Sequence, residues 1–198
     1  MPNRVPSASS HDAVGAIVLC GGTSRRLGGD DKTAMRLGDR SILETLVASL
    51  PTDWPVVCVG DPRELSREVR WAREDPPLGG PVAGLVAGLE RCPTPIVVAL
   101  AGDQPFAGTT AAACVAALRD RPELDGVAAR QPDGRLQPLL AAYRREPLAS
   151  ALNSAPHRDA GVYRTLAGLR LDGLAPLGHA VLDVDTPADL DEARRHVR

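Results

Sequence analysis

Short runs of apolar residues alternate along this chain with longer segments whose apolar residues recur every three or four positions. The first run, VGAIVLC, ends at Gly21-Gly22 and is almost free of polar side chains, which is typical of a strand covered on both faces of a sheet. Similar runs, each bounded by turn-forming or charged residues, predict further strands. The predicted strands cover residues 14–20, 56–60, 69–73, 95–101, 126–129, 138–143 and 180–184.

Helices are predicted between most of these strands. Ser41 followed by Glu44 is a capping-box pattern, and it opens an apolar-periodic segment that continues to residue 50. Thr186 and Pro187 start the last helix, with threonine as the N-cap and proline at the first helical position. Two glycines weaken the helix predicted for 81–91, by about a kcal/mol each relative to alanine. The other predicted helices cover 111–119 and 147–153.

This alternation indicates an α/β fold, with a mostly parallel central sheet and helices on both faces. No internal repeat and no linker is found, so we expect one domain over residues 13–198. Residues 1–12 are polar and are expected to form a disordered N-terminal tail. In such sheets ligands bind at the carboxyl ends of the strands. The loops after the strands are therefore the candidate sites of chemistry.

The composition excludes several classes of protein. Of the 198 residues 43% are hydrophobic and 24% are charged, as in ordinary soluble proteins, and the formal net charge is −2. The two tryptophans, two tyrosines and one phenylalanine are scattered, so neither nucleic acid nor a membrane surface is an expected partner. The sequence shows no secretory signal and no apolar membrane span, and its four cysteines form no C-x-x-C pair. A cytoplasmic location is expected.

A loop rich in glycine and positive charge follows the first predicted strand. It reads LCGGTSRRLGGDDK from Leu19 to Lys32. Gly21 and Gly22 let the backbone approach a ligand closely, while Arg25 and Lys32 add positive charge, a combination that suits a polyphosphate. Neither a Walker-type loop nor a dinucleotide-binding fingerprint fits the spacing of the glycines. From the residues alone, the alternative is a surface loop with a solvated charge cluster.

The same loop resembles the signature of the molybdenum cofactor guanylyltransferases, L-x-G-G-x-S-R-R-x-G-x-D-K, give or take one residue. The resemblance extends over most of the chain, from about residue 16 to residue 194. It implies a three-layer Rossmann-like nucleotidyltransferase fold and the transfer of GMP from GTP to molybdopterin, with release of pyrophosphate and use of Mg²⁺. The nucleotide-binding residues that it implies are Leu19, Cys20, Gly21, Gly22, Arg25, Lys32, Gly60, Asp75, Gly80 and Asp103.

Asp75 is the candidate contact for the base or ribose. In the resembling family an aspartate precedes a G-P-x-x-G loop that helps to hold the nucleoside, and Asp75 precedes the sequence LGGPVAG. A carboxylate that accepts two N–H donors suits guanine better than cytosine. An ordinary acidic loop punctuated by glycine and proline is the alternative.

Asp103 and Asp185 are the candidate ligands of Mg²⁺. Asp103 follows a strongly apolar strand, and a strand-end carboxylate beside a phosphate loop is where a hard divalent ion is held. The family places a metal-binding aspartate here in G-D-x-P form, although a turn-forming aspartate is also common after strands. Asp185 belongs to DVDTP, which resembles the family's closing D-x-N/D-T-P motif. It is either a second metal ligand or, together with Asp183, a negative charge at a helix N-terminus.

The resemblance implies an in-line attack by a phosphate oxygen of the acceptor on the α-phosphorus of GTP, with Arg25, Lys32 and Asp103 as catalytic residues. Such a transfer needs positioning and charge neutralisation more than a covalent nucleophile, and no histidine lies in a triad-like pattern. Arg135 and Gln137 fall where family members carry a polar residue before proline, which implies contact with the acceptor. Transient contacts with other cofactor-biosynthesis proteins or client molybdoenzymes are also expected.

Departures from the family pattern leave two alternatives open. Cys20 replaces the usual alanine, Gly60-Asp61 stands where guanylyl enzymes often have asparagine, and the form GDQP around Asp103 recurs among cytidylyl enzymes. The first alternative is therefore a cytidylyltransferase, or a nucleotidyltransferase with another phosphorylated acceptor. The second is a non-catalytic nucleotide-binding protein, although binding alone does not require the full set of Arg25, Lys32 and Asp103.

Overall fold

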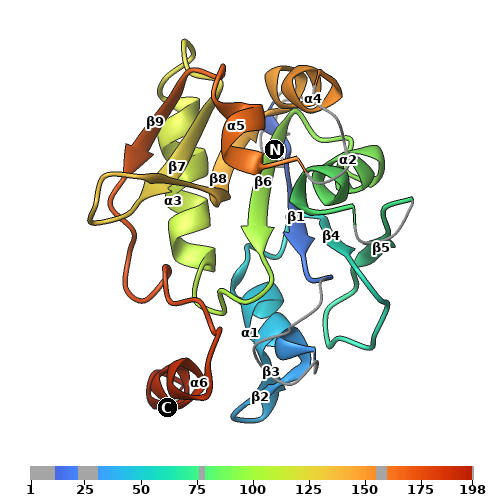
Figure 1. Cartoon of the computed structure of the whole chain (residues 1–198), viewed down its shortest axis with the longest axis vertical. Coiled ribbons are helices and arrows are strands. Elements are labelled where there is room, and N and C mark those ends of the chain that lie inside the picture. The colour runs from blue at the N-terminus through green and yellow to red at the C-terminus, as the bar shows by residue number, and fades with distance from the viewer. Residues whose placement is uncertain (1–11, 22–30, 76–78, 155–159, 198) are drawn as a thin grey trace, which may run out of the picture.

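Seven strands form one central sheet in the part of the chain that the computed structural model describes, which is residues 12–21, 31–75, 79–154 and 160–197. The strand order is β5-β4-β1-β6-β8-β7-β9 (Figure 1). A separate hairpin pairs β2 (Arg36–Leu37) with β3 (Arg40–Ser41). The strands of the sheet are β1 (Val14–Leu19), β4 (Val56–Val59), β5 (Arg70–Ala72), β6 (Ile96–Ala101), β7 (Gly126–Arg130), β8 (Leu136–Arg144) and β9 (Leu171–Leu174).

Most neighbouring strands run parallel, as the alternation of strands and helices predicts. β1 pairs in parallel with β4 and with β6, β4 pairs in parallel with β5, and β7 pairs in parallel with β9. β8 is the exception, because it follows β7 through a short turn and is antiparallel to both β7 and β6. The predicted α/β class with a mostly parallel sheet is confirmed.

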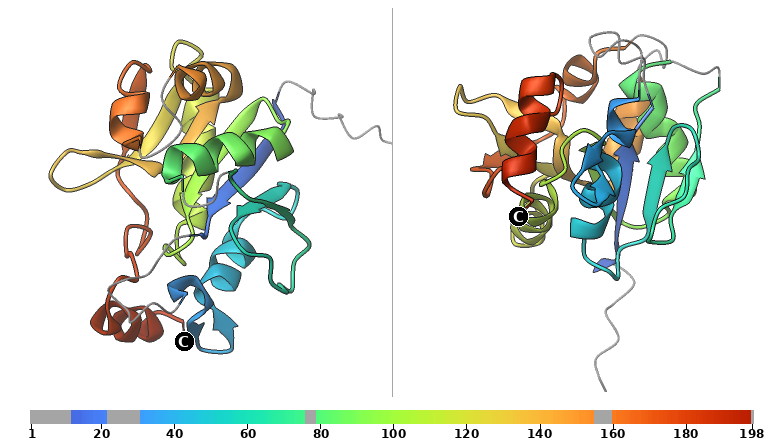
Figure 2. Two further views of the ribbon diagram at one scale, coloured as in Figure 1. Left: turned by 45° about the vertical axis from the view of Figure 1, so that its right-hand side comes forward. Right: turned by 90° about the horizontal axis from the view of Figure 1, so that it is seen from below.

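Helices cover both faces of this sheet and make a three-layer structure (Figures 1 and 2). α1 and α3 pack on one face in a buried cluster that includes Val18 of β1, and α2, α4 and α5 pack on the other face with Ile17. Successive side chains of β1 thus point to opposite faces of the sheet and pack in different clusters, which is why the strand is apolar throughout. These helices are α1 (Ile42–Ser49), α2 (Pro81–Arg91), α3 (Gly108–Arg119), α4 (Arg145–Asn153) and α5 (Val162–Leu166).

α6 (Pro187–Arg195) lies apart from the two helix layers that cover the sheet, near the β2–β3 hairpin (Figure 1). A small buried cluster holds it there, formed by Leu37, Ile42, Val184 and Ala193. The end of the chain is thereby placed beside the segment that follows the glycine-rich loop.

Both predicted helix starts are confirmed by their caps. The Ser41 hydroxyl accepts a hydrogen bond from the Glu44 N–H at 3.1 Å, while the Glu44 carboxylate accepts from the N–H of Ser66 at 3.3 Å. At α6 the capping box is complete, because the side chains of Thr186 and Asp189 each accept from the other's backbone N–H. Asp189 therefore belongs to the cap.

The prediction of a strand at 180–184 is wrong. Ala180 and Val184 are fully buried, but this segment forms turns and irregular backbone. The Val184 N–H donates to the carbonyl of Asp103 at 3.1 Å, and the Leu182 N–H donates to the carbonyl of His179 at 3.0 Å. The run is apolar because its side chains are buried, although its backbone does not pair in the sheet. The last strand is β9, where aspartate and glycine, both weak strand formers, obscure the pattern.

Several short elements were not predicted, and the bounds of some others differ from the prediction. The β2–β3 hairpin and α5 are too short to show a periodic pattern, and α3 begins at Gly108, three residues before the predicted start. All four cysteines are buried free thiols, and Cys20 and Cys58 pack as small apolar residues in the same buried cluster as Val18. Apart from residue 12, the predicted tail lies outside the described residues. Among the described residues, no helix combines the length and the apolar character that a membrane crossing requires.

Candidate functional site

Two loops leave the sheet side by side at the carboxyl ends of β1 and β6. These strands are parallel neighbours, and Leu19 at the end of β1 is in register with Ala101 at the end of β6. The Gly102 N–H donates to the carbonyl of Leu19 at 2.8 Å, and a Cβ atom at Gly102 would lie 2.9 Å from that oxygen. The glycine lets the β6 loop stay close to β1, so Asp103 is placed beside the glycine-rich loop.

Lys32 reaches Asp103 and Asp185 from the other end of that loop. It begins a short 3-10 helix, Lys32–Ala34, whose N-cap is Asp31. Its Nζ donates to Asp185 Oδ1 at 2.7 Å and also to Asp103 Oδ2. The lysine and Asp103 side chains are 24% and 16% exposed, and that of Asp185 is 45% exposed. A partly buried ammonium therefore joins two carboxylates from distant parts of the sequence.

Residues 183–185, here called the closing segment, are tied to the end of β6 by two more bonds. The Val184 N–H donates to the main-chain carbonyl of Asp103 at 3.1 Å, as described above. The Gln104 amide nitrogen donates to Asp183 Oδ1 at 2.7 Å. These contacts come from a backbone group and a buried amide, so the closing segment is held even without the lysine.

Gln104 also connects the site to β8. Its amide nitrogen donates to Gln137 Oε1 at 2.9 Å, and both side chains are buried. A buried amide pair costs free energy unless it is hydrogen-bonded, so this pair specifies how β8 packs against the end of β6.

Aromatic contacts place α6 against the loop that follows Asp103. The Phe106 ring lies edge-on to the imidazole of His196, with centroids 6.1 Å apart. His196 in turn stacks on His179, with ring centroids 3.5 Å apart. The end of α6 is thus packed onto the same part of the chain that carries Asp103.

Electrostatics at the site follow from burial and from the proximity of carboxylates. Burial lowers the pKa of Lys32, but the hydrogen bonds and charges of Asp103 and Asp185 outweigh it, so the pKa lies above its ordinary value. Burial raises the pKa of Asp183, the charges of Asp103 and Asp185 raise it further, and the hydrogen bond from Gln104 opposes the shift. Lys32 therefore remains a cation at neutral pH beside three clustered aspartates.

Asp103 and Asp185 fit the predicted Mg²⁺ by their chemistry. Asp103 Oδ1 is buried and has no hydrogen-bond partner within the described residues. A buried carboxylate oxygen without a donor is costly, and a cation can satisfy it. In the described part of the chain no group of three His, Cys, Asp or Glu side chains could hold a metal ion. Mg²⁺ needs only one or two protein carboxylates when phosphates and water complete its shell.

Close backbone packing joins the ends of β1 and β4. Gly60 has φ of +152°, and a Cβ atom there would lie 2.8 Å from the backbone nitrogen of Gly21. The N–H groups of Cys20 and Gly21 both donate to the carbonyl of Val59 at 3.0 Å. These two N–H groups therefore bond to the neighbouring strand in this structure, and the nucleotide contacts predicted for Leu19, Cys20, Gly21 and Gly60 stay predictions.

The remaining predicted nucleotide contacts stay predictions. Gly22 and Arg25 lie outside the described residues. Asp75 is exposed and follows β5, and Gly80 is the N-cap of α2 with φ of +89°. Because β5, β4 and β1 are parallel, Asp75 follows β5 at the same edge of the sheet as the loop after β1.

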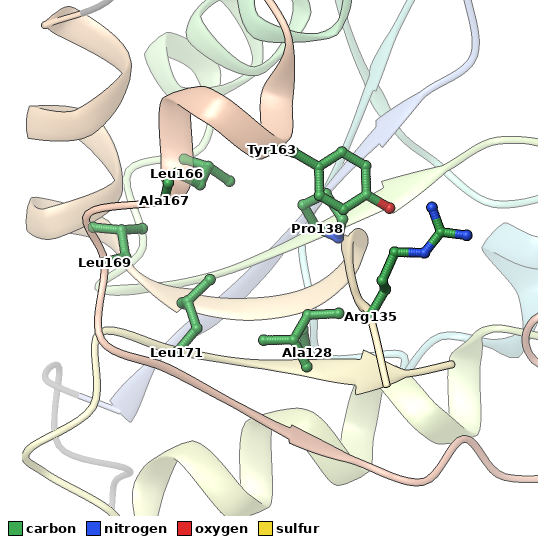
Figure 3. A pocket seen from close by; sticks show the side chains of 9 residues that line it. Ala128, Arg135, Pro138, Tyr163, Leu166, Ala167, Leu169 and Leu171 are labelled. Atoms are coloured by element: carbon green, nitrogen blue, oxygen red, sulfur yellow. The ribbon is translucent and has the colours of Figure 1, made fainter. Parts of the chain in front are cut away.

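The two predicted acceptor residues are in different surroundings. Gln137 is buried and bonded to Gln104, whereas the Arg135 side chain is 73% exposed and pairs with Asp133 at 2.7 Å. Arg135 lines a pocket of about 290 Å³ whose other walls are mostly apolar, and Tyr163 stands beside it (Figure 3). The pocket is lined by Ala128, Arg135, Leu136, Pro138, Tyr163, Leu166, Ala167, Leu169 and Leu171.

Sequence reasoning missed Gln104, Asp183 as a hydrogen-bond acceptor, and Tyr163. The signal for Gln104 was its position directly after the strand-end aspartate. Tyr163 lies on a helix too short to predict, so no sequence pattern pointed to it.

The fold and this site define a class of protein. A mostly parallel α/β sheet presents, at the carboxyl edge of two neighbouring strands, a lysine and two aspartates that converge on one point. This arrangement suits the positioning and charge neutralisation that phosphoryl and nucleotidyl transfer require. The class is that of α/β nucleotidyltransferases.

Comparisons with known proteins agree with this class and identify the family. Residues 16–173 match the MobA-like NTP transferase domain. A molybdenum cofactor guanylyltransferase from Mesorhizobium japonicum is 34% identical over an alignment of 143 residues, which covers 67% of this chain and 68% of that protein. Another from Acidiphilium cryptum is 30% identical over an alignment of 193 residues, which covers 90% of this chain and 92% of that protein.

Among solved structures, the molybdopterin-guanine dinucleotide biosynthesis protein A from Archaeoglobus fulgidus superposes with a TM-score of 0.70 at 20% identity, covering 91% of this chain and 97% of that one. This similarity shows the shared Rossmann-like fold. The chain belongs to the MobA-like NTP transferase domain family, among the molybdenum cofactor guanylyltransferases. The resemblance implied by the glycine-rich loop is confirmed, and the protein is a nucleotidyltransferase.

Proposed function

We propose that this protein transfers GMP from GTP to molybdopterin, releases pyrophosphate, requires Mg²⁺ and acts in the cytoplasm. The observation that carries the proposal is that Lys32 Nζ hydrogen-bonds to both Asp103 and Asp185, with a distance of 2.7 Å to Asp185 Oδ1. Family membership supports the reaction class, and the relatives named guanylyltransferases support the choice of GTP.

The protein's own part in the reaction is to position two phosphate groups and to balance their charge. Lys32 and Arg25 would contact the triphosphate and stabilise the pyrophosphate as it leaves. Asp103 and Asp185 would hold Mg²⁺, which when bound neutralises phosphate oxygens and polarises the α-phosphorus. The attacking phosphate oxygen of the acceptor is already an anion, so no general base is required.

On the acceptor side we propose that Arg135 contacts the substrate directly and that Gln137 acts through Gln104. Arg135 is exposed at a largely apolar pocket beside Tyr163, which suits a flat ring system that carries an anionic group (Figure 3). Gln137 is buried against Gln104, so its role is to position the strand end that carries Asp103.

The test is an assay of the purified protein with GTP, Mg²⁺ and molybdopterin. We expect pyrophosphate release that depends on all three, together with a guanylylated product detected by chromatography. CTP in place of GTP is the matched comparison, and activity with CTP alone would move the protein to the cytidylyl alternative. A nucleotide-induced rise in the melting temperature without pyrophosphate release would support the non-catalytic alternative.

A further inference from the structure

Lys32 lies where the two acidic side chains of the site converge. Its Nζ hydrogen-bonds to Asp103 Oδ2 and, at 2.7 Å, to Asp185 Oδ1. Asp103 and Asp185 come from different segments, and the Val184 N–H bond to Asp103 brings those segments together. Two carboxylates held this close repel one another unless a cation lies between them. In this structure the ammonium of Lys32 is that cation.

A divalent ion ligated by the same two carboxylates competes with the lysine for their charge. Mg²⁺ lies about 2.1 Å from its oxygen ligands, so an ion held by Asp103 and Asp185, even through the partnerless Asp103 Oδ1, would lie within a few ångströms of the ammonium that is bonded to both. Two cations this close repel each other. Binding of the metal to both carboxylates therefore favours departure of the lysine side chain.

We propose that Lys32 is an exchangeable counter-ion. It occupies the divalent-cation position in the nucleotide-free protein and moves to the phosphates when metal and nucleotide bind together. This proposal rests on the proposed function, because it takes the nucleoside triphosphate as the ligand that receives the lysine. Its consequence is that Lys32 weakens the binding of metal alone and makes metal and nucleotide binding cooperative.

The local structure allows such an exchange. The backbone at Lys32 is anchored, because the Asp31 carboxylate accepts from the Thr33 N–H at 3.0 Å and pairs with Arg63 at 2.7 Å. The lysine side chain beyond this anchor is a flexible four-carbon chain with a compact charge, which can change partners without moving the backbone. The bonds of the closing segment to Asp103 and Gln104 do not involve the lysine, so its departure does not require them to break.

The sequence makes this residue unusually easy to follow. Lys32 is the only lysine among the 198 residues, whereas the chain has 22 arginines. Incorporation of lysine labelled with ¹³C at Cε marks this one residue and leaves all three N–H donors of its ammonium in place. A single lysine resonance can therefore report where the side chain lies.

The first experiment measures Mn²⁺ binding by electron paramagnetic resonance without nucleotide. We expect Lys32→Met to bind Mn²⁺ about tenfold or more tightly than the unmodified protein, because the competing cation is gone. Lys32→Arg keeps the charge and should show no such gain. Arg63→Met is the control: it also removes one positive charge near the site, but Arg63 pairs with Asp31 and not with the two metal-site aspartates. It therefore shows how much Mn²⁺ affinity changes when any nearby positive charge is lost. Equal or weaker Mn²⁺ binding in Lys32→Met would overturn the proposal.

The second experiment needs no substitution and covers the case in which Lys32→Met does not fold. In the protein labelled with ¹³Cε-lysine, Mg²⁺ with GTP should shift the Lys32 resonance, whereas the same Mg²⁺ concentration without GTP should leave it in place. A resonance that does not move when GTP binds would contradict the exchange. Pyrophosphate release is measured separately. If the enzyme is active but its lysine stays on the aspartates, this inference is refuted and the proposed function still holds.

Discussion

Lys32 and Asp185 are 153 positions apart in the sequence and are joined by a hydrogen bond of 2.7 Å. The pair connects the loop after the first strand to the segment just before the last helix. Asp103, at the end of β6, lies on the other side of the same ammonium. The beginning, middle and end of the chain therefore meet at one point, which is the candidate site of nucleotidyl transfer.

We predict that Lys32→Ala and Asp103→Ala each lower turnover on the order of 10²-fold or more, because each removes charge stabilisation from the transition state. Turnover is measured as pyrophosphate release, and circular dichroism checks that each variant is folded. Asp191→Ala removes an exposed pair with Arg194 on α6 and serves as a control with normal turnover. Near-normal turnover in both site variants would remove the proposed mechanism.

The buried amide of Gln104 makes a prediction about stability. Gln104→Ala leaves the acceptor oxygens of Gln137 and Asp183 without their donor, so we expect a loss of about 1–3 kcal/mol in the free energy of unfolding. Gln137→Leu, which keeps the bond between Gln104 and Asp183, should cost less. Urea titration of both variants gives the comparison. An equal loss in the two would show that the bond to Asp183 contributes nothing.

Gly60 and Gly80 form a matched pair, since both have positive φ. Among the described residues, a Cβ atom at Gly80 meets no atom within 4 Å beyond its chain neighbours and its own helix, so Gly80→Ala should cost only backbone strain, roughly 1–3 kcal/mol. At Gly60 the same atom would lie 2.8 Å from the backbone of Gly21, and the strands would have to separate. Gly60→Ala should therefore destabilise the protein more than Gly80→Ala in urea titration. The reverse order would contradict the close packing of β1 and β4.

Asp125 should contribute stability that depends on pH. Its carboxylate accepts from the Arg170 side chain at 2.7 and 3.1 Å and from the Arg170 N–H at 2.9 Å. The hydrogen bonds from Arg170 lower the pKa of Asp125 below its ordinary value of 3.8, so the contribution is present above that value and is lost as pH falls through the folded-state pKa.

We expect Asp125→Ala to cost about 2 kcal/mol near pH 7 and progressively less below pH 4, measured by urea unfolding across that range. Turnover per folded molecule should not change, because Asp125 lies outside the site. A pH-independent loss would mean that packing, and not the ion pair, is responsible.

Arg135 should affect the acceptor and not the nucleotide. We predict that Arg135→Ala raises the KM for molybdopterin about tenfold, as expected for the loss of one charge-assisted contact, while the KM for GTP stays the same. Arg130→Ala is a suitable control, because Arg130 is a nearby arginine that pairs with Asp172 and does not line the pocket. A change in the KM for GTP alone would place Arg135 on the nucleotide side.

Much of the fold could be predicted because local signals agreed with the tertiary structure. The apolar runs of β1, β4 and β6 are buried on both faces, and α2 has the bounds that its sequence predicts. The apolar run at 180–184 led to a wrong strand prediction for a physical reason. Burial makes a segment apolar whether or not its backbone pairs in a sheet, and here the Val184 N–H bonds to the loop of Asp103.

The sequence by itself determined the α/β class, the glycine-rich loop and the aspartates at the ends of elements, because these depend on side-chain type and on spacing over a few residues. Only the tertiary structure decided that Asp185 shares Lys32 with Asp103, that Gln137 is buried against Gln104, and that Arg135 lines a pocket with Tyr163. Those relationships join residues far apart along the chain. They exist because parallel strands bring their carboxyl ends, and the loops that follow them, to one edge of the sheet.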